Sequence, residues 1–170
     1  INTALEKFIG SASNGQWRVE AYDISNTNGV DSVGAMVVFE GSSPVRRDYR
    51  RFKIRTVEGP NDFGSMQEVL TRRFRRGVQG DQSFGKMPDL ILMDGGKPQV
   101  SAAEQVLAEM KIDIPVAGMV KDDKHRTRGL LYQDQEIDLK NDPILYRYAA
   151  AIQEEVHRFA IDYHRGLRKK

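Results

Sequence analysis

An acidic residue interrupts the apolar face of the first predicted strand. In the stretch Trp17–Gly29 (WRVEAYDISNTNG), Trp17, Val19 and Ala21 share one parity, and Asp23 is the next residue on it. Because side chains alternate between the two faces of a strand, Asp23 occupies a position where the pattern requires an apolar side chain. Burying an uncompensated carboxylate costs on the order of several kcal/mol, so a cation or hydrogen-bond donors are expected beside it.

A second apolar strand also ends in a carboxylate. Residues 89–94 (DLILMD) form a short run typical of a central strand covered on both faces, and Gly95 and Gly96 follow it. Taken alone, Asp94 is equally well explained as the first residue of an Asp-Gly-Gly turn. Two such strands that each deliver a carboxylate predict a divalent-metal site, and hard oxygen ligands favour Mg²⁺ or Mn²⁺.

Composition limits the class of protein. The chain has 170 residues, of which 39% are hydrophobic and 29% charged, so one globular domain is expected. The absence of cysteine excludes disulfides and thiolate metal sites. No apolar run approaches the length of a membrane span and no signal peptide is visible, which predicts a cytoplasmic protein with no membrane partner. The first residue is Ile1, not Met, which suggests a fragment of a longer protein.

The order of predicted elements indicates a fold class. Three strands with short turns (17–25, 32–40 and 48–56) precede a helix from Asp62, a strand at 89–94, a helix from Pro98, a strand at 114–120, a small hairpin at 130–139 and a last helix at 143–165. This order predicts an α/β fold with a ribonuclease-H-like, mixed five-stranded sheet flanked by helices. Residues 1–15 are expected to be a lead-in segment, and residues 16–170 the domain.

Three further residues are candidates for chemistry. His157 lies at the border of the buried face of the last helix, where it suits proton transfer or metal ligation, although a histidine there is more often structural. Asp62 is explained as the N-cap of its helix, and a catalytic role requires that helix to begin beside the strand ends. Lys121 follows a strand, so it is either a phosphate contact or an ordinary surface lysine.

Basic residues gather in clusters although the formal net charge is only +2. Such local patches predict a polyanionic partner, and solvated faces are the alternative. The candidate DNA contacts are Arg50, Arg51, Lys53, Arg72, Arg73 and Lys121.

Several motifs together resemble one known family. They are YDISNTNG (22–29), RRFKI (50–54), NDFGSMQEVLTRRF (61–74), PDLILMDGGKPQ (88–99), KDDKHRT (121–127) and EEVHRFAIDYHR (154–165). In this order they resemble the C-terminal nuclease domain of UvrC, the incision subunit of bacterial nucleotide excision repair. The resemblance implies a ribonuclease-H-like endonuclease that cuts on the 5′ side of a DNA lesion. It maps the metal-binding and catalytic acids onto Asp23 and Asp94, the catalytic histidine onto His157, and a further acid onto Asp62.

The resemblance also implies a cofactor and partners. Mg²⁺ or Mn²⁺ would be held by Asp23, Asp94 and His157, and His157 would replace the acid usual at this place in ribonuclease-H-like sites. The substrate would be damaged double-stranded DNA, and UvrB would bind through family segments that have no counterpart here. Pro98, where the family often has Gly, is a departure that a helix start tolerates. Two alternatives remain open: a nuclease for RNA or RNA–DNA hybrids, and a catalytically silent nucleic-acid-binding module.

Overall fold

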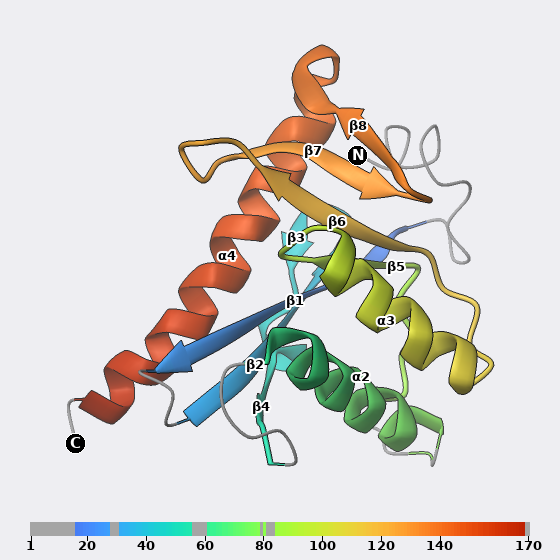
Figure 1. The fold of residues 1–170 in the computed structure, drawn as a ribbon, viewed down its shortest axis with the longest axis vertical. Helices are drawn as coiled ribbons and strands as arrows, with labels where there is room; N and C mark the ends of the chain where they lie inside the picture. Colours follow the sequence, from blue (N-terminus) through green and yellow to red (C-terminus); the bar gives the residue numbers. More distant parts are fainter. Residues whose placement is uncertain (1–15, 28–30, 56–60, 79, 81–83, 169–170) are drawn as a thin grey trace.

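Helices cover both faces of one mixed sheet. The structure is a computed structural model that describes residues 16–27, 31–55, 61–78, 80 and 84–168. Helix α4 (Pro143–Arg168) covers one face, and α2 (Asp62–Val78) and α3 (Lys97–Glu109) cover the other (Figure 1). Among the described residues, no helix is both long and apolar enough to cross a membrane.

The sheet has eight strands in the described part of the chain. They are β1 (Arg18–Thr27), β2 (Asp31–Glu40), β3 (Ser43–Pro44), β4 (Arg50–Lys53), β5 (Leu90–Met93), β6 (Val116–Lys121), β7 (Thr127–Tyr132) and β8 (Gln135–Asp138). Their order is β3-β2-β1-β5-β6-β7-β8, and β4 also pairs with β2. Strands β1, β5 and β6 are parallel neighbours, whereas the remaining pairs are antiparallel. Short 3₁₀ helices occupy Arg46–Asp48 and Leu139–Asn141.

The predicted α/β class, with a mixed sheet between helices, is confirmed, but five strands were too few. The short strand β3 and the hairpin of β7 and β8 extend the sheet to eight. The hairpin was recognisable from its residues, whereas its pairing with β6 was not, because the charged residues between them carry no apolar pattern. The predicted lead-in segment at 1–15 lies outside the described residues.

The parity of each strand decides which helix its side chains meet. In β1, Val19 and Ala21 belong to the core beneath α4, while Tyr22 belongs to the core beneath α2 and α3. In β5, Leu90 and Leu92 also face α4. The alternation that placed Asp23 on an apolar face therefore places it on the face covered by α4.

The N-cap of α2 is not the predicted residue. The side-chain Oδ1 of Asn61 accepts a hydrogen bond from the backbone N–H of Gly64 at 3.0 Å, and the Asn61 carbonyl accepts one from Ser65. Asn61 is thus the cap, and Asp62 is the first helical residue, where its charge still favours the positive end of the helix dipole.

Arg73 is buried, contrary to its predicted place on a basic surface. Its guanidinium donates to both carboxylate oxygens of Glu20, each at 2.8 Å, and to the carbonyls of Phe84 at 2.9 Å and Lys86 at 2.6 Å. Glu20 itself is fully buried, on the face of β1 that α2 covers, and it accepts a hydrogen bond from the Tyr22 hydroxyl. A guanidinium enclosed in this way is not accessible to a DNA phosphate, so Arg73 is removed from the candidate DNA contacts.

Candidate metal centre

The two predicted carboxylates lie at the same edge of the sheet. Parallel strands β1 and β5 pair Ala21 with Leu92, and the backbone N–H of Asp94 donates to the carbonyl of Tyr22 at 2.9 Å. Asp23 lies two residues after Ala21, and Asp94 lies two residues after Leu92. Both acids are therefore on the face of the sheet that α4 covers. Carboxyl ends of parallel strands are a recurrent place for ligand sites in α/β folds, because the chain leaves the sheet there.

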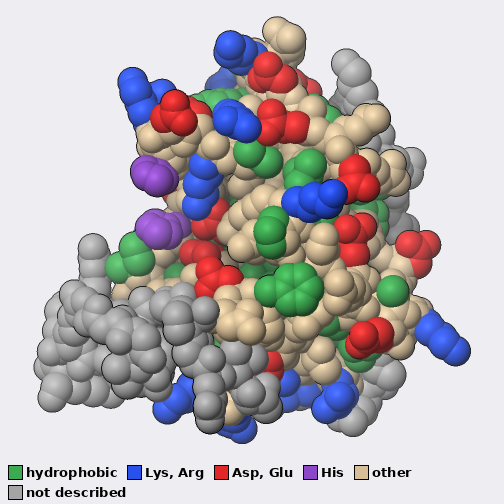
Figure 2. All heavy atoms as spheres, in the orientation of Figure 1, with side chains coloured by type: hydrophobic (Ala, Val, Ile, Leu, Met, Phe, Trp, Pro, Cys, Tyr) green, Lys and Arg blue, Asp and Glu red, His purple; other side chains and the backbone are tan. Residues whose placement is uncertain are grey.

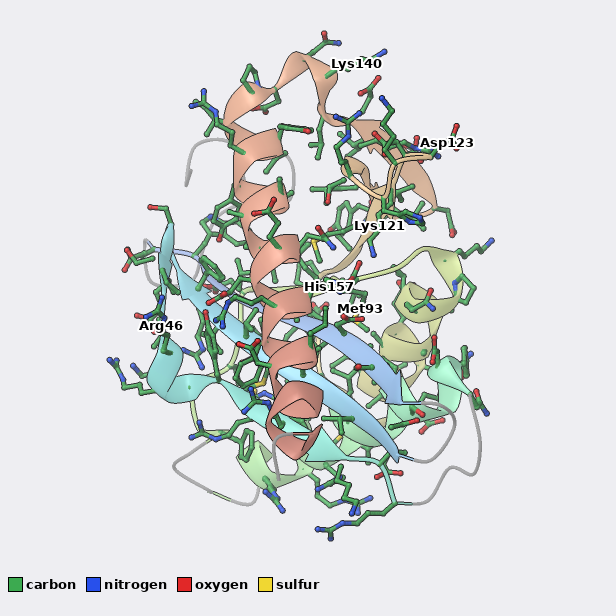
Figure 3. The ribbon with its side chains drawn as sticks, turned by 90° about the vertical axis from the view of Figure 1, so that its left-hand side faces the viewer. Arg46, Met93, Lys121, Asp123, Lys140 and His157 are labelled. Carbon is green, nitrogen blue, oxygen red and sulfur yellow. The ribbon has the colours of Figure 1, made fainter. Side chains whose placement is uncertain are left out.

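Lys121 and His157 complete the group. Lys121 ends β6, the next parallel strand, on the same parity as Met119, which lies in the core beneath α4. Its Nζ lies 2.7 Å from Asp94 Oδ1. From the opposite side, His157 on α4 places Nδ1 3.7 Å from Asp23 Oδ2. Figure 3 shows His157 projecting from α4 toward the region where Met93 and Lys121 lie.

One donor atom from each of Asp23, Asp94 and His157 lies within 4.8 Å of the others. The side chains of Asp23, Asp94 and His157 are 15%, 2% and 56% exposed, respectively. Solvent therefore reaches the group from the side of His157, whereas Asp94 is buried. Figure 2 shows histidine and acidic side chains gathered beside one another on this side of the molecule. Among the described residues, Asp62 is not a member of this group.

The carboxylates lack full compensation. Burial, and next the charge of Asp94, raise the pKa of Asp23 to about 7, against the opposing effects of Lys121 and the Ile24 backbone. The charge of Asp62 adds a smaller increase to the Asp23 pKa, so the start of α2 is electrostatically close. Asp94 Oδ1 is buried and has no hydrogen-bond partner among the described residues, so the short contact with Lys121 is an ion pair without hydrogen-bond geometry.

This donor set fits a divalent cation. Two carboxylates held together repel unless one is protonated or a cation lies between them. The raised Asp23 pKa is the sign of that repulsion here, whereas the ammonium of Lys121 partly offsets the charge of Asp94. The two carboxylates supply the hard oxygen ligands that suit Mg²⁺ or Mn²⁺. The predicted residues Asp23, Asp94 and His157 are therefore brought together as potential ligands.

A glycine keeps the turn after Asp94 tight. A Cβ atom at Gly118 in β6 would collide with the carbonyl oxygen of Gly95, so the two backbones approach at a distance that only glycine permits. Sequence reasoning missed this contact, and it missed the ion pair between Lys121 and Asp94. The available signal for the ion pair was the parity of Lys121 with the apolar residues of its strand.

The remaining candidate DNA contacts divide between the two faces of the sheet. Arg51 stacks on Phe159 of α4, with the guanidinium carbon 3.8 Å from the ring centroid, and Lys53 shares its parity. Arg50 lies on the opposite parity and donates to the carbonyls of its neighbours in the chain. Arg72, on α2, donates to the Lys53 carbonyl at 2.7 Å. Arg51 and Lys53 are thus on the same side as the metal centre, whereas Arg50 and Arg72 face α2.

We expect the raised Asp23 pKa to make folding stability fall as pH rises. The carboxyl pKa is about 7 in the folded chain against 3.8 ordinarily, so the folded state binds this proton more tightly. One pKa unit corresponds to about 1.36 kcal/mol, so this proton contributes about 4 kcal/mol to the free energy of unfolding below about pH 4. That contribution is lost as the pH rises through 7 to about 8. Urea unfolding in the presence of a chelator measures this loss. The difference in the free energy of unfolding between wild type and Asp23→Asn should change by about 4 kcal/mol between pH 4 and pH 8. Parallel pH profiles for the two proteins would contradict the assignment.

Comparisons with known proteins identify the family of this chain. Residues 10–161 match the family model described as the UvrC RNAse H endonuclease domain. The chain is 60% identical over 156 residues to UvrABC system protein C of Finegoldia magna and 56% identical over 165 residues to that of Clostridium acetobutylicum. Each match covers 90% of this chain but 26% of the relative, so the chain spans about a quarter of their length.

A solved structure supports the fold. The crystal structure of human ENDOV superposes with a TM-score of 0.50 at 15% identity, covering 91% of this chain and 86% of that one. At this identity the likeness concerns the fold alone. The family model and the sequence relatives carry the assignment. The chain belongs to the UvrC RNase H endonuclease domain family.

Proposed function

We propose that the chain is a metal-dependent DNA endonuclease domain that cuts one strand on the 5′ side of a lesion in nucleotide excision repair. The observation that carries the proposal is the convergence of Asp23, Asp94 and His157 at the ends of two parallel strands and on α4. A silent binding module would have no need to keep two undercompensated carboxylates together, because this arrangement costs folding stability.

Each residue of the metal centre has a proposed role that depends on its position. Asp23 and Asp94 would hold Mg²⁺ or Mn²⁺, which when bound supplies a more acidic water and stabilises the leaving oxygen. His157 faces Asp23 through Nδ1 and its side chain is 56% exposed, so its imidazole would serve in proton transfer or as a metal ligand at the open side of the centre. Lys121 is 31% exposed and anchored by Asp94, which orients its ammonium toward a phosphate entering the centre.

Membership of the family supports a proposed substrate and partner. Damaged double-stranded DNA would be the substrate, and UvrB would associate through the parts of the longer relatives that this chain does not span. Asp62 remains a proposed auxiliary acid, supported by its electrostatic effect on Asp23 at the start of α2.

A domain exchange tests the proposal. This chain would replace the matching quarter of the Finegoldia magna relative, to which it is 60% identical. In the presence of the other UvrABC proteins, the chimera should make the 5′ cut in a duplex with one bulky lesion in Mg²⁺ or Mn²⁺, and not with a chelator. A chimera that binds DNA but never makes this cut would instead support the silent module. Preferential cutting of an RNA–DNA hybrid in competition would support the ribonuclease alternative.

Basic residues on the face of the sheet that carries the metal centre should contribute more to DNA affinity than basic residues on the opposite face. Arg51→Ala or Lys53→Ala should weaken binding and lower the slope of log affinity against log salt by about 1, because each removes one phosphate contact. Arg50→Ala, one residue away on the other face, is the matched control with a smaller expected effect. Fluorescence anisotropy over a salt series measures both quantities. An equal or larger loss in Arg50→Ala would place the DNA on the other face.

A further inference from the structure

A groove continues from the metal centre between α4 and the turn that joins β6 to β7. Its volume is about 730 Å³, and Lys121 and His157 belong to both the groove and the centre. Sites for small ligands usually measure roughly 300–1,000 Å³. The groove is thus large enough to hold part of a bound molecule whose reacting group lies at the metal centre.

One wall of the groove is a stripe along α4. Tyr146, Ala150, Gln153 and His157 line it at helical spacing. From Tyr146 to His157 the helix rises ~16 Å, at ~1.5 Å per residue. That length corresponds to about five nucleotides of a stacked single strand at ~3.4 Å each, and to fewer if the bases are unstacked.

The opposite wall carries groups suited to an anionic, hydrogen-bonding chain. Lys121 and His125 come from the turn, which bends sharply because His125 adopts a positive φ of 61°. The two arginines that line the groove are neutralised locally, since Arg126 pairs with Asp122 and Arg158 pairs with Asp162. Lys121 is likewise paired with Asp94, but it lies where the metal centre meets the groove, so a phosphate there can share its ammonium, and His125 offers a ring N–H beside it.

A buried hydroxyl in the same wall has no partner. Thr127 is 3% exposed and lines the groove, and its Oγ1 makes no hydrogen bond within the described part of the chain. Leaving a buried polar group unpaired costs about 1–3 kcal/mol. Such groups are rare in folded proteins, and because Oγ1 has almost no exposed surface, a ligand atom in the groove becomes its partner once the wall around Thr127 shifts slightly.

An aromatic ring lies at the end of the groove away from the metal centre. Tyr146 is 37% exposed, which is unusual for a large apolar side chain in this structure. Proteins that hold single-stranded nucleic acid combine cationic grooves with exposed aromatic rings, because every base can stack on a ring regardless of its identity. A base reaches such a ring only after leaving its own stack in the duplex.

We propose that this groove holds a short unpaired stretch of the cut strand, with phosphate near Lys121 and His125, a polar contact at Thr127, and one base stacked on Tyr146. The inference rests on the proposed function and adds to it a path for the strand beyond the scissile phosphate. It also implies that the duplex is locally opened on this side of the cut.

Binding measured without cleavage tests the stacking contact. Anisotropy in Ca²⁺ would compare a fully paired duplex with one that has a short unpaired stretch beside the expected cut. For the second DNA, Tyr146→Ala should bind about tenfold more weakly, and Tyr146→Phe should bind like wild type, because the ring is retained. Ile144→Ala, at a more exposed apolar position of α4 (54% against 37% for Tyr146) that lines a different pocket, should have no effect. For the fully paired duplex, the loss in Tyr146→Ala should be smaller.

A second variant separates ligand contact from folding. Thr127→Val keeps the shape of the side chain and removes a hydroxyl that has no partner in the described residues. It should weaken binding to the partly unpaired DNA while urea unfolding shows equal or greater stability. A structural hydroxyl would give the opposite result, with lower stability and unchanged binding.

The outcomes for the groove and for the proposed function are distinguishable. If Tyr146→Ala and Thr127→Val bind and cut like wild type while Asp23→Asn does not cut, the groove does not hold the strand and the endonuclease proposal stands. If the wild-type chain never cuts but both groove variants lose affinity for the unpaired DNA, the groove binds nucleic acid and the endonuclease proposal fails.

Discussion

Asp23→Asn or Asp94→Asn is expected to reduce DNA nicking by at least ~10³-fold while the protein still folds and binds DNA. Each substitution removes one negative charge from the group that would hold the metal ion, and losing several kcal/mol of charge stabilisation in the transition state corresponds to about this factor. DNA affinity should be retained or increased, because a carboxylate that repels phosphate has been removed.

Three measurements make this prediction specific. Initial nicking rates are measured in Mg²⁺ and Mn²⁺, DNA affinity by anisotropy, and Mn²⁺ affinity by titration calorimetry. Asp113→Asn is the matched control, since this exposed acid precedes β6 at the end of the strand opposite to Lys121. Nicking at the wild-type rate by Asp23→Asn or Asp94→Asn would remove that residue from the centre, whatever its effect on metal binding.

Arg73→Leu is expected to destabilise the fold by about 3–5 kcal/mol, because it leaves the buried carboxylate of Glu20 without its cation. It also removes the hydrogen bonds that hold the carbonyls of Phe84 and Lys86 near α2. The free energy of unfolding in urea measures the loss. Nicking by the folded fraction should remain, since Arg73 lies on the face of the sheet opposite to the metal centre.

A neighbouring arginine and a second substitution control this result. Arg72→Ala removes a partly exposed guanidinium from the same helix and should cost about 1 kcal/mol or less. Adding Glu20→Gln to Arg73→Leu should recover part of the stability, because the orphaned charge is then absent. A loss in Arg73→Leu no larger than that in Arg72→Ala would show that the buried ion pair does not stabilise the fold.

The sequence by itself determined the strands that carry the acids and the face on which Asp23 lies. That inference needed only local information, because the alternation of side chains along a strand is a property of its own backbone. The continuous apolar run before Asp94 likewise predicted a central strand, and β5 is buried throughout. The motifs around Asp23, Asp94 and His157 also identified the family that the comparisons show.

Only the tertiary structure decided which charged residues are buried in ion pairs and which stay near the surface. Arg72 and Arg73 are adjacent in sequence, yet Arg73 is buried against Glu20 and Arg72 remains near the surface. The ion pair of Lys121 with Asp94, and the groove between Tyr146 and Thr127, depend in the same way on segments far apart in the chain. The physical reason is that local periodicity fixes the direction of a side chain, whereas its partner depends on which strands are neighbours and in what register they pair.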